Sequence, residues 1–188
     1  MVDEAEIKKA VTSIIEAIGE DSEREGLIDT PRRFAEMYSE LFMGLGQNPI
    51  EELEVGYELG HREMVILKDI PFYSMCEHHL LPFYGVVHIG YIPNEEGRVV
   101  GISKLARVVE IVAKRPQIQE RMATEIADAI VDGLKPDGVA VVIQAEHMCM
   151  IMRGIKKPGS SVITSALRGN FRKKPASRAE FFSLIKGR

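Results

Sequence analysis

The sequence has only two cysteines, no long hydrophobic run and no excess of basic residues, and each shortage excludes a class of protein. Two cysteines cannot build a disulfide scaffold, and a chain of 188 residues buries enough apolar surface to fold without one. No apolar stretch approaches the roughly 20 residues that span a bilayer, so a membrane is not an expected partner. The first ten residues lack the pattern of a secretory signal. We therefore expect a protein of the reducing cytoplasm.

Basic residues are slightly outnumbered, because 24 lysines and arginines stand against 28 acidic residues, for a net charge of −4. Binding to the phosphate backbone of nucleic acid requires a basic surface, so nucleic acid is not an expected partner either. Positive charge does gather near the carboxyl end, where Glu180 is the one acidic residue after Arg168. We interpret this segment as a solvated tail.

Hydrophobic periodicity predicts pairs of helices that alternate with pairs of strands. Apolar residues at helical spacing predict helices over about 3–19, 29–46, 103–115 and 116–134, and a shorter one from about residue 178. Runs rich in β-branched and aromatic residues predict strands over 63–70, 83–92, 138–146 and 161–167. We expect Asp3 to cap the first helix and Ser103 to cap the third.

Side chains that bind metals are concentrated in two short segments, YSMCEHH and HMC. Cys76 and His79 are three residues apart, a spacing found in many zinc ligand pairs on turns. Cys149 supplies a third ligand, and on a strand it shares one face with His147. Three protein ligands are typical of catalytic zinc, which keeps a position for water and lowers the pKa of that water to about 7. His78 and His147 then remain as proton carriers beside the metal.

Other interpretations of these residues stay open on spacing alone. A single cysteine or histidine in an apolar strand is usually part of the packing, although their joint concentration in two segments favours a metal. With His78 or His147 as a fourth ligand, the site is a closed structural zinc site. The corresponding alternative function is a non-catalytic, zinc-stabilised oligomeric binding module.

Two further groups of residues suit a nucleotide. Ser103, Lys104 and Arg107 begin a predicted helix, where free amides and the helix dipole attract phosphate, although an ordinary capped helix has the same pattern. Gln119 and Glu120 follow, and a carboxylate there can accept two hydrogen bonds from guanine. Residues 154–161 imitate the spacing of a phosphate-binding loop but have serine in place of its lysine, so a nucleoside triphosphatase is not supported.

The segments CEHHLLPF, GISKLAR, RPQIQER and QAEHMCMIMRG, in this order, resemble the GTP cyclohydrolase I family. The resemblance extends from EGLIDTPRRFAEMY at residues 25–38 to TSALRGNF at residues 164–171. It implies a zinc-dependent enzyme that opens the guanine ring of GTP at C8 by hydrolysis, releases formate and closes the product to 7,8-dihydroneopterin triphosphate. This reaction is the first step of folate and pterin biosynthesis.

The resemblance also implies an α+β architecture, the tunnelling fold (T-fold), in which an antiparallel four-stranded sheet carries two helices on one face. An N-terminal helical arm, residues 1–60, then precedes a catalytic domain, residues 61–188. The implied assembly is a homodecamer of two pentamers with active sites at subunit interfaces. A nitrile reductase of the deazaguanine pathway has the same fold but needs a thiol free to attack its substrate, whereas both thiols here are assigned to the metal.

Each implied site residue has a counterpart in this sequence. The implied ligands of Zn²⁺ are Cys76, His79 and Cys149, and the implied catalytic residues are His78 and His147. The implied contacts of GTP are Gln119 and Glu120 for guanine, and Ser103, Lys104, Arg107, Arg153 and Arg33 for the triphosphate. Glu36 departs from the pattern, because a basic residue often stands at its position, one helical turn after Arg33.

Overall fold

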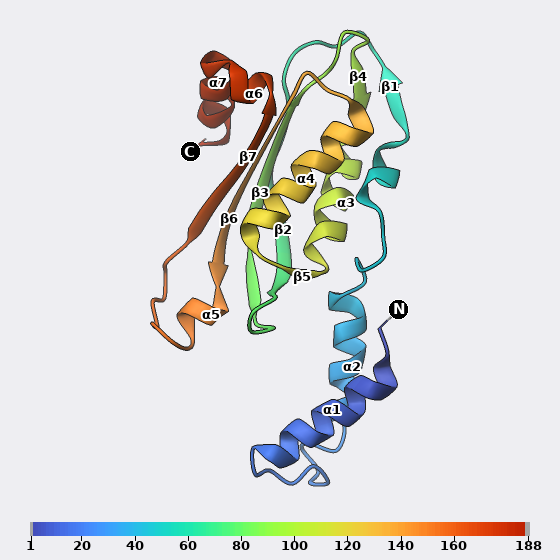
Figure 1. Cartoon of the computed structure of the whole chain (residues 1–188), viewed down its shortest axis with the longest axis vertical. Coiled ribbons are helices and arrows are strands. Elements are labelled where there is room, and N and C mark those ends of the chain that lie inside the picture. The colour runs from blue at the N-terminus through green and yellow to red at the C-terminus, as the bar shows by residue number, and fades with distance from the viewer. Residues whose placement is uncertain (1, 187–188) are drawn as a thin grey trace.

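A computed structural model of the chain describes residues 2–186, with an N-terminal helical hairpin that extends away from a sheet domain (Figure 1). α1 (Glu4–Ala17) and α2 (Thr30–Leu41) form this hairpin and pack against each other. Asp3 caps α1 as predicted, since its carboxylate accepts hydrogen bonds from the amides of Ala5 and Glu6, each at 3.1 Å. α2 ends earlier than predicted, because residues 42–46 form turns.

The sheet domain is built on four long antiparallel strands, as predicted, with one short strand added at an edge. In spatial order its strands are β5 (Pro116–Gln117), β2 (Val65–Cys76), β3 (Pro82–Ile92), β6 (Gly138–His147) and β7 (Val162–Gly169). β5 runs parallel to β2, so Pro116 belongs to a strand and not to the start of a helix as predicted. A separate two-stranded sheet pairs β1 (Gly56–Glu58) with β4 (Arg98–Val100).

Two helices cover one face of the main sheet (Figure 1). α3 (Ile102–Ala113) and α4 (Gln119–Leu134) bury their apolar stripes against alternate residues of the strands. Phe83, Ile89 and Tyr91 of β3 are completely buried in this core. The predicted cap of α3 is wrong, because Gly101 occupies the N-cap position, no side chain caps the helix, and Ser103 lies within the first turn.

Short elements complete the chain. They are η1 (Pro49–Leu53), α5 (Met148–Ile151), α6 (Asn170–Lys173) and α7 (Pro175–Ile185). α6 and α7 cover one end of the other sheet face, where Phe171 and Phe181 are buried against Ala140. None of the helices within residues 2–186 is long and apolar enough to cross a membrane.

The connection between the hairpin and the sheet domain is fixed by hydrogen bonds to the backbone of Gly44. The amide of Gly44 donates to the carbonyl of Lys114 at 3.1 Å, and Arg115 donates from Nε to the carbonyl of Gly44 at 3.0 Å. A Cβ atom at Gly44 would stand 2.1 Å from the carbonyl oxygen of Ile111, so only glycine allows this approach. The hairpin is therefore tied to the carboxyl end of α3.

η1 attaches the next part of the connection to the sheet domain. Leu53 is completely buried and packs closely on Gly133 of α4. A Cβ atom added at Gly133 would lie 2.7 Å from the Cβ of Leu53. β1 adds the pairing with β4. Residues 49–58 thus contact the sheet domain, although the arm predicted from the sequence extends to residue 60. The division into two domains at that residue remains a prediction.

Leu53→Ala tests how strongly η1 is anchored. The substitution removes a fully buried side chain and leaves a cavity, so we expect the free energy of unfolding to fall by about 2–5 kcal/mol. Urea denaturation followed by circular dichroism measures this loss. Leu59→Ala is the control, because Leu59 is 69% exposed and should contribute little. Equal stability of the two variants would contradict the anchoring role.

Candidate metal centre

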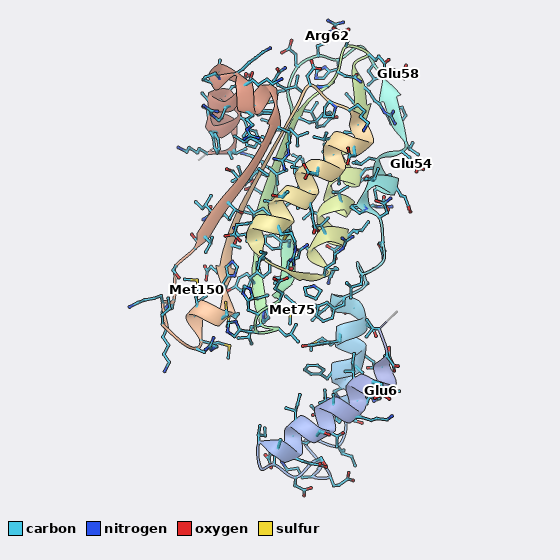
Figure 2. All side chains as sticks on the ribbon, viewed as in Figure 1. Glu6, Glu54, Glu58, Arg62, Met75 and Met150 are labelled. Carbon is cyan, nitrogen blue, oxygen red and sulfur yellow. The ribbon has the colours of Figure 1, made fainter. Side chains whose placement is uncertain are left out.

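The two thiols and the imidazole that spacing selected lie together at one end of the sheet domain. One ligand atom each of Cys76, His79 and Cys149 lies within 4.8 Å of the other two. Met75 and Met150, their sequence neighbours, mark this end in Figure 2. Zinc in a tetrahedral site holds sulfur and nitrogen ligands roughly 3.5–4 Å apart, so small side-chain movements bring these donors onto one ion. The donor set therefore fits Zn²⁺.

A tight turn after β2 brings His79 back toward Cys76. The Cys76 amide donates to the carbonyl of Leu81 at 2.9 Å, and the Leu80 amide donates to the carbonyl of Cys76 at 2.8 Å. Leu80 adopts a positive φ of 49°, which is an uncommon conformation for a leucine and closes the turn. The spacing of three residues thus works because the strand ends at Cys76 and the chain reverses at once.

Cys149 reaches the group from a helical turn and not from a strand. β6 ends at His147, and Met148–Ile151 form α5. The prediction that His147 and Cys149 share one strand face is therefore wrong. Burial raises the pKa of the Cys149 thiol, and the neighbouring Cys76 raises it further. A thiol whose pKa is raised needs a cation beside it to become a thiolate at neutral pH, which is the chemistry of a metal site.

Gln119 fixes the orientation of His147. The Gln119 side chain is buried, and its Nε2 donates toward the carbonyl of Ile143 at 3.1 Å, the carbonyl of Val162 at 3.0 Å and Oγ1 of Thr164 at 3.2 Å. A reversed amide would set its oxygen against two carbonyls, so Oε1 must face His147 Nε2, 2.8 Å away. Because Oε1 can only accept, Nε2 of His147 carries a proton, and Nδ1 is the atom left to exchange one.

Two further neighbours set the state of His147. Its ring stacks on Phe83, with centroids 4.7 Å apart and planes 3° apart. Burial lowers the pKa of His147, while the negative charge of Glu120 opposes that change. The ring is therefore neutral at neutral pH and has a carboxylate near it that stabilises the protonated form. These are properties of a proton carrier.

Arg153 forms a hydrogen bond with the imidazole of His79. Its Nη1 lies 2.7 Å from His79 Nε2, and because a guanidinium only donates, that nitrogen must accept. A metal on Nε2 would take the same lone pair. A metal on Nδ1 would leave the proton of the neutral ring on Nε2, which could then no longer accept. Either way, a metal held by His79 would take the place of the hydrogen bond from Arg153.

The turn that carries the ligands is braced by residues that sequence reasoning did not single out. Glu77 forms a very short ion pair with Arg121 of α4, and this contact lowers the pKa of Glu77. Arg121 also donates from Nε to Oε1 of Gln117 at 3.0 Å, and the amide of Glu77 donates to the carbonyl of Gln117 at 3.0 Å. Gln117 belongs to β5 and Arg121 to α4, so the contact depends on the turn between these elements, which local spacing does not reveal. His78 points outward from this turn and is 64% exposed.

The structure separates the predicted phosphate contacts from the metal ligands within one chain. α3 follows β4 and runs from that side of the domain toward β5, so that its start points away from α5 (Figure 1), and a helix of 12 residues spans roughly 18 Å. Ser103, Lys104 and Arg107 therefore lie away from the metal ligands, unlike Arg153. Arg33 lies on α2 in the hairpin and is exposed, and nearby Glu36 binds Arg32 at 3.0 Å. Within one chain, these residues and the three candidate metal ligands do not form a single site.

Comparison with known proteins decides the family. The sequence model described as GTP cyclohydrolase I matches residues 7–186. The chain belongs to the GTP cyclohydrolase I family. It is 79% identical over 185 residues to a protein named GTP cyclohydrolase 1 from Dehalococcoides mccartyi, with 98% of each chain covered. It is 63% identical to a protein of that name from Carboxydothermus hydrogenoformans, with 98% of this chain and 96% of the other covered.

The fold of this member of the GTP cyclohydrolase I family is the tunnelling fold, as the resemblance implied. The antiparallel sheet and the two helices on one face agree with that expectation. A solved structure titled as an archaeosine synthase QueF-Like in the apo form aligns at a TM-score of 0.42 and 20% identity, over 56% of this chain and 93% of that chain. A dihydroneopterin aldolase from Burkholderia thailendensis, bound to guanine, aligns at 0.42 and 15% identity, over 59% and 93%.

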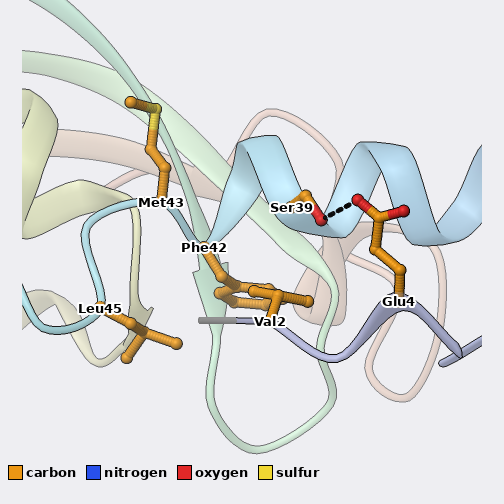
Figure 3. Close-up of a pocket in the computed structure, with 6 residues that line it drawn as sticks. All are labelled: Val2, Glu4, Ser39, Phe42, Met43 and Leu45. Atoms are coloured by element: carbon orange, nitrogen blue, oxygen red, sulfur yellow. Dashed lines mark hydrogen bonds between the residues drawn. The ribbon is translucent and has the colours of Figure 1, made fainter. Parts of the chain in front are cut away.

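A pocket in the hairpin lies apart from this site. It has a volume of about 400 Å³ and is lined by Val2, Glu4, Ser39, Phe42, Met43 and Leu45 (Figure 3). The hydroxyl of Ser39 donates to Oε1 of Glu4 at 2.8 Å, so these two polar side chains of the pocket wall are hydrogen-bonded to each other. None of the residues implied in metal or GTP binding lines this pocket, so we assign it no part in the chemistry.

Proposed function

We propose that this chain catalyses the GTP cyclohydrolase I reaction: hydrolysis of the guanine ring of GTP at C8, release of formate and closure to 7,8-dihydroneopterin triphosphate. The observation that carries the proposal is the group of Cys76, His79 and Cys149, which within residues 2–186 has three members and stands beside an oriented His147. Three ligands leave a coordination position for water. The names of the relatives support the same reaction.

Zn²⁺ is the proposed ion, and these three residues would hold it. When bound, the ion supplies a Lewis acid that makes water a nucleophile at neutral pH. Both cysteines are free thiols, which suits a reducing compartment, and we propose the cytoplasm as the place of action. A closed structural site would instead need a fourth protein ligand, and His147 is turned toward Gln119 in this structure.

His147 is the proposed proton carrier of the reaction. Its Nδ1 can accept a proton or donate one to a nitrogen of the purine, while Nε2–H stays on Gln119. Glu120 stabilises the charged ring. His78, which is exposed beside the ligands, is the proposed second carrier. The chain thus supplies one carrier with a fixed direction and one with freedom to move.

The proposed substrate contacts divide between the two ends of GTP. Glu120 is exposed at the start of α4, where its carboxylate can accept hydrogen bonds from N1–H and the 2-amino group of guanine. Ser103, Lys104, Arg107, Arg153 and Arg33 are the proposed triphosphate contacts. Because several of them lie far from the metal ligands of their own chain, we propose a decamer of two pentamers with active sites between subunits.

Incubation of the metal-loaded protein with GTP tests the proposed function. After oxidation and dephosphorylation, fluorescent neopterin should appear, with one formate for each GTP consumed. Guanosine triphosphate recovered intact from protein with a full complement of zinc would contradict the assignment. A zinc-stabilised binding module predicts this second result, so the assay separates the two functions.

Glu120→Ala tests the recognition of guanine. Loss of a carboxylate that accepts two hydrogen bonds should lower GTP turnover by about a hundredfold or more, because each charge-assisted bond contributes about 1.5–3 kcal/mol. Bound zinc should be unchanged, since Glu120 is not one of the three ligands. Glu96→Ala, at another exposed glutamate, is the matched control. Turnover equal to that of the control would remove Glu120 from the guanine site.

A further inference from the structure

A carboxylate already holds two of the proposed phosphate contacts. Nζ of Lys104 donates to Oε2 of Glu52 at 3.0 Å, and Nη1 of Arg107 lies 3.5 Å from the same oxygen. The Glu52 side chain is 24% exposed and that of Lys104 is 29% exposed, so water reaches the pair only in part. The hydrogen bond from Lys104 holds the pKa of Glu52 below its ordinary value, which keeps the carboxylate ionised at neutral pH.

The backbone around Glu52 fixes its carboxylate over the start of α3. Leu53, the next residue, is completely buried, and Asn48 caps η1 by accepting a hydrogen bond from the amide of Ile50 at 3.2 Å. On the other side, Arg98 donates from Nη2 to the carbonyl of Glu54 at 3.0 Å. Figure 2 shows Glu54 far from the end that Met75 and Met150 mark. Glu52 therefore serves the phosphate contacts and not the metal ligands.

The charges at this place favour an anion, and Glu52 is the anion that the chain supplies. α3 has no side-chain cap, so its first amides and the positive end of its dipole add to the charges of Lys104 and Arg107. Glu52 halves the net positive charge of these two side chains. A phosphate group that binds them must take the place of the carboxylate, because two anions at one ion pair repel each other.

We propose that Glu52 competes with the phosphates of the substrate for Lys104 and Arg107 and thereby sets the affinity of the site for GTP. The inference rests on the phosphate role proposed above for these two residues. Glu52 keeps both basic side chains aligned until a phosphate takes them. The same contact lowers the affinity, because the ion pairs must break when the substrate binds.

Glu52→Gln tests the competition. The amide oxygen can still accept from Lys104, but the negative charge is gone, so inorganic tripolyphosphate should bind about fivefold more tightly, as expected when one like charge about 4 Å away is removed in a water-exposed site. Titration calorimetry on the assembled, metal-loaded protein measures this affinity. Binding to the variant should also weaken more steeply with added salt. The KM for GTP should fall by a similar factor.

Glu51→Gln is the matched control, because Glu51 lies in the same short helix, is exposed and forms no ion pair within residues 2–186. Its tripolyphosphate affinity should stay within about twofold of the wild type, by the small effect of a distant surface charge. Glu52→Asp shortens the side chain and should give an intermediate gain, which provides a second variant if Glu52→Gln folds poorly. Unchanged or weaker binding by the Gln and Asp variants would overturn the inference.

The test is independent of catalysis. Tripolyphosphate binding requires no turnover. Failure of the wild type to convert GTP would therefore contradict the proposed function, but the affinities of the Glu52 variants for tripolyphosphate would still test the competition. Lys104→Gln should weaken tripolyphosphate binding. If it did not, phosphate would not bind at Lys104, and the inference would be wrong even for an active enzyme.

Discussion

We expect Cys149→Ala to abolish both GTP turnover and the retention of the metal. Removal of one of three ligands leaves Cys76 and His79, which cannot hold a zinc ion against competing chelators. We expect zinc affinity to fall by more than about a hundredfold, since even loss of a residue that merely orients a ligand costs 10–100-fold. Turnover should fall by at least about a thousandfold, as expected when the group that activates water is lost.

Competition with a chromogenic chelator measures the zinc affinity of this variant. Met152→Ala is the matched control, because Met152 is exposed and lies just beyond α5. Zinc affinity of the wild type should also fall as the pH falls, because protons compete for two thiolates, and the Cys149 thiol has a raised pKa. Retention of one zinc per chain by Cys149→Ala would show that the ion is held elsewhere.

Gln119→Leu is expected to lower kcat by about a hundredfold while the metal content stays full. The variant loses the oxygen that holds Nε2–H of His147, so the ring is free to turn and to change tautomer. The KM for GTP should change little. If Gln119 contacted guanine directly, as the resemblance implied, the opposite split would appear, with a raised KM and a nearly unchanged kcat.

Nitrogen-15 spectra of the imidazoles give a second readout for Gln119. In the wild type, the metal-loaded protein should show His147 protonated at Nε2, and in Gln119→Leu the signals should report a mixture of tautomers. Thr164→Val is the control, since it removes one of three acceptors of the Gln119 amide and leaves its oxygen on His147. Similar loss of kcat in both variants would indicate general disruption of the buried amide and not loss of orientation.

Local spacing predicted that the candidate ligands Cys76 and His79 lie together, because the chain reverses directly after Cys76. A strand that ends at one ligand and a tight turn that returns the other are properties of a few neighbouring residues, and the sequence contains them. The four long strands and the pair of covering helices were predictable for the same reason, since their periodicity is local. The short strand β5 was not, because its two residues are placed by pairing with β2.

Other features depend on contacts between distant segments, which periodicity does not record. Cys149 was expected on a strand, but β6 ends at His147, and the Cys149 thiol approaches Cys76 and His79 from the helical turn α5. The orientation of the Gln119 amide depends on carbonyls of β6 and β7. The ion pair of Glu52 with Lys104 joins residues that are far apart along the chain. Each is a result of tertiary packing.

The close approach of Gly44 to Ile111 determines where the hairpin points. Since that contact joins main chain to main chain, backbone geometry at Gly44 contributes to the direction of α1 and α2. Substitutions on the hairpin surface can therefore alter which molecules the hairpin binds without changing its direction. By contrast, the methyl group of an alanine at residue 44 would force the backbone apart and change the direction of the whole hairpin, although every residue on the hairpin surface would stay the same.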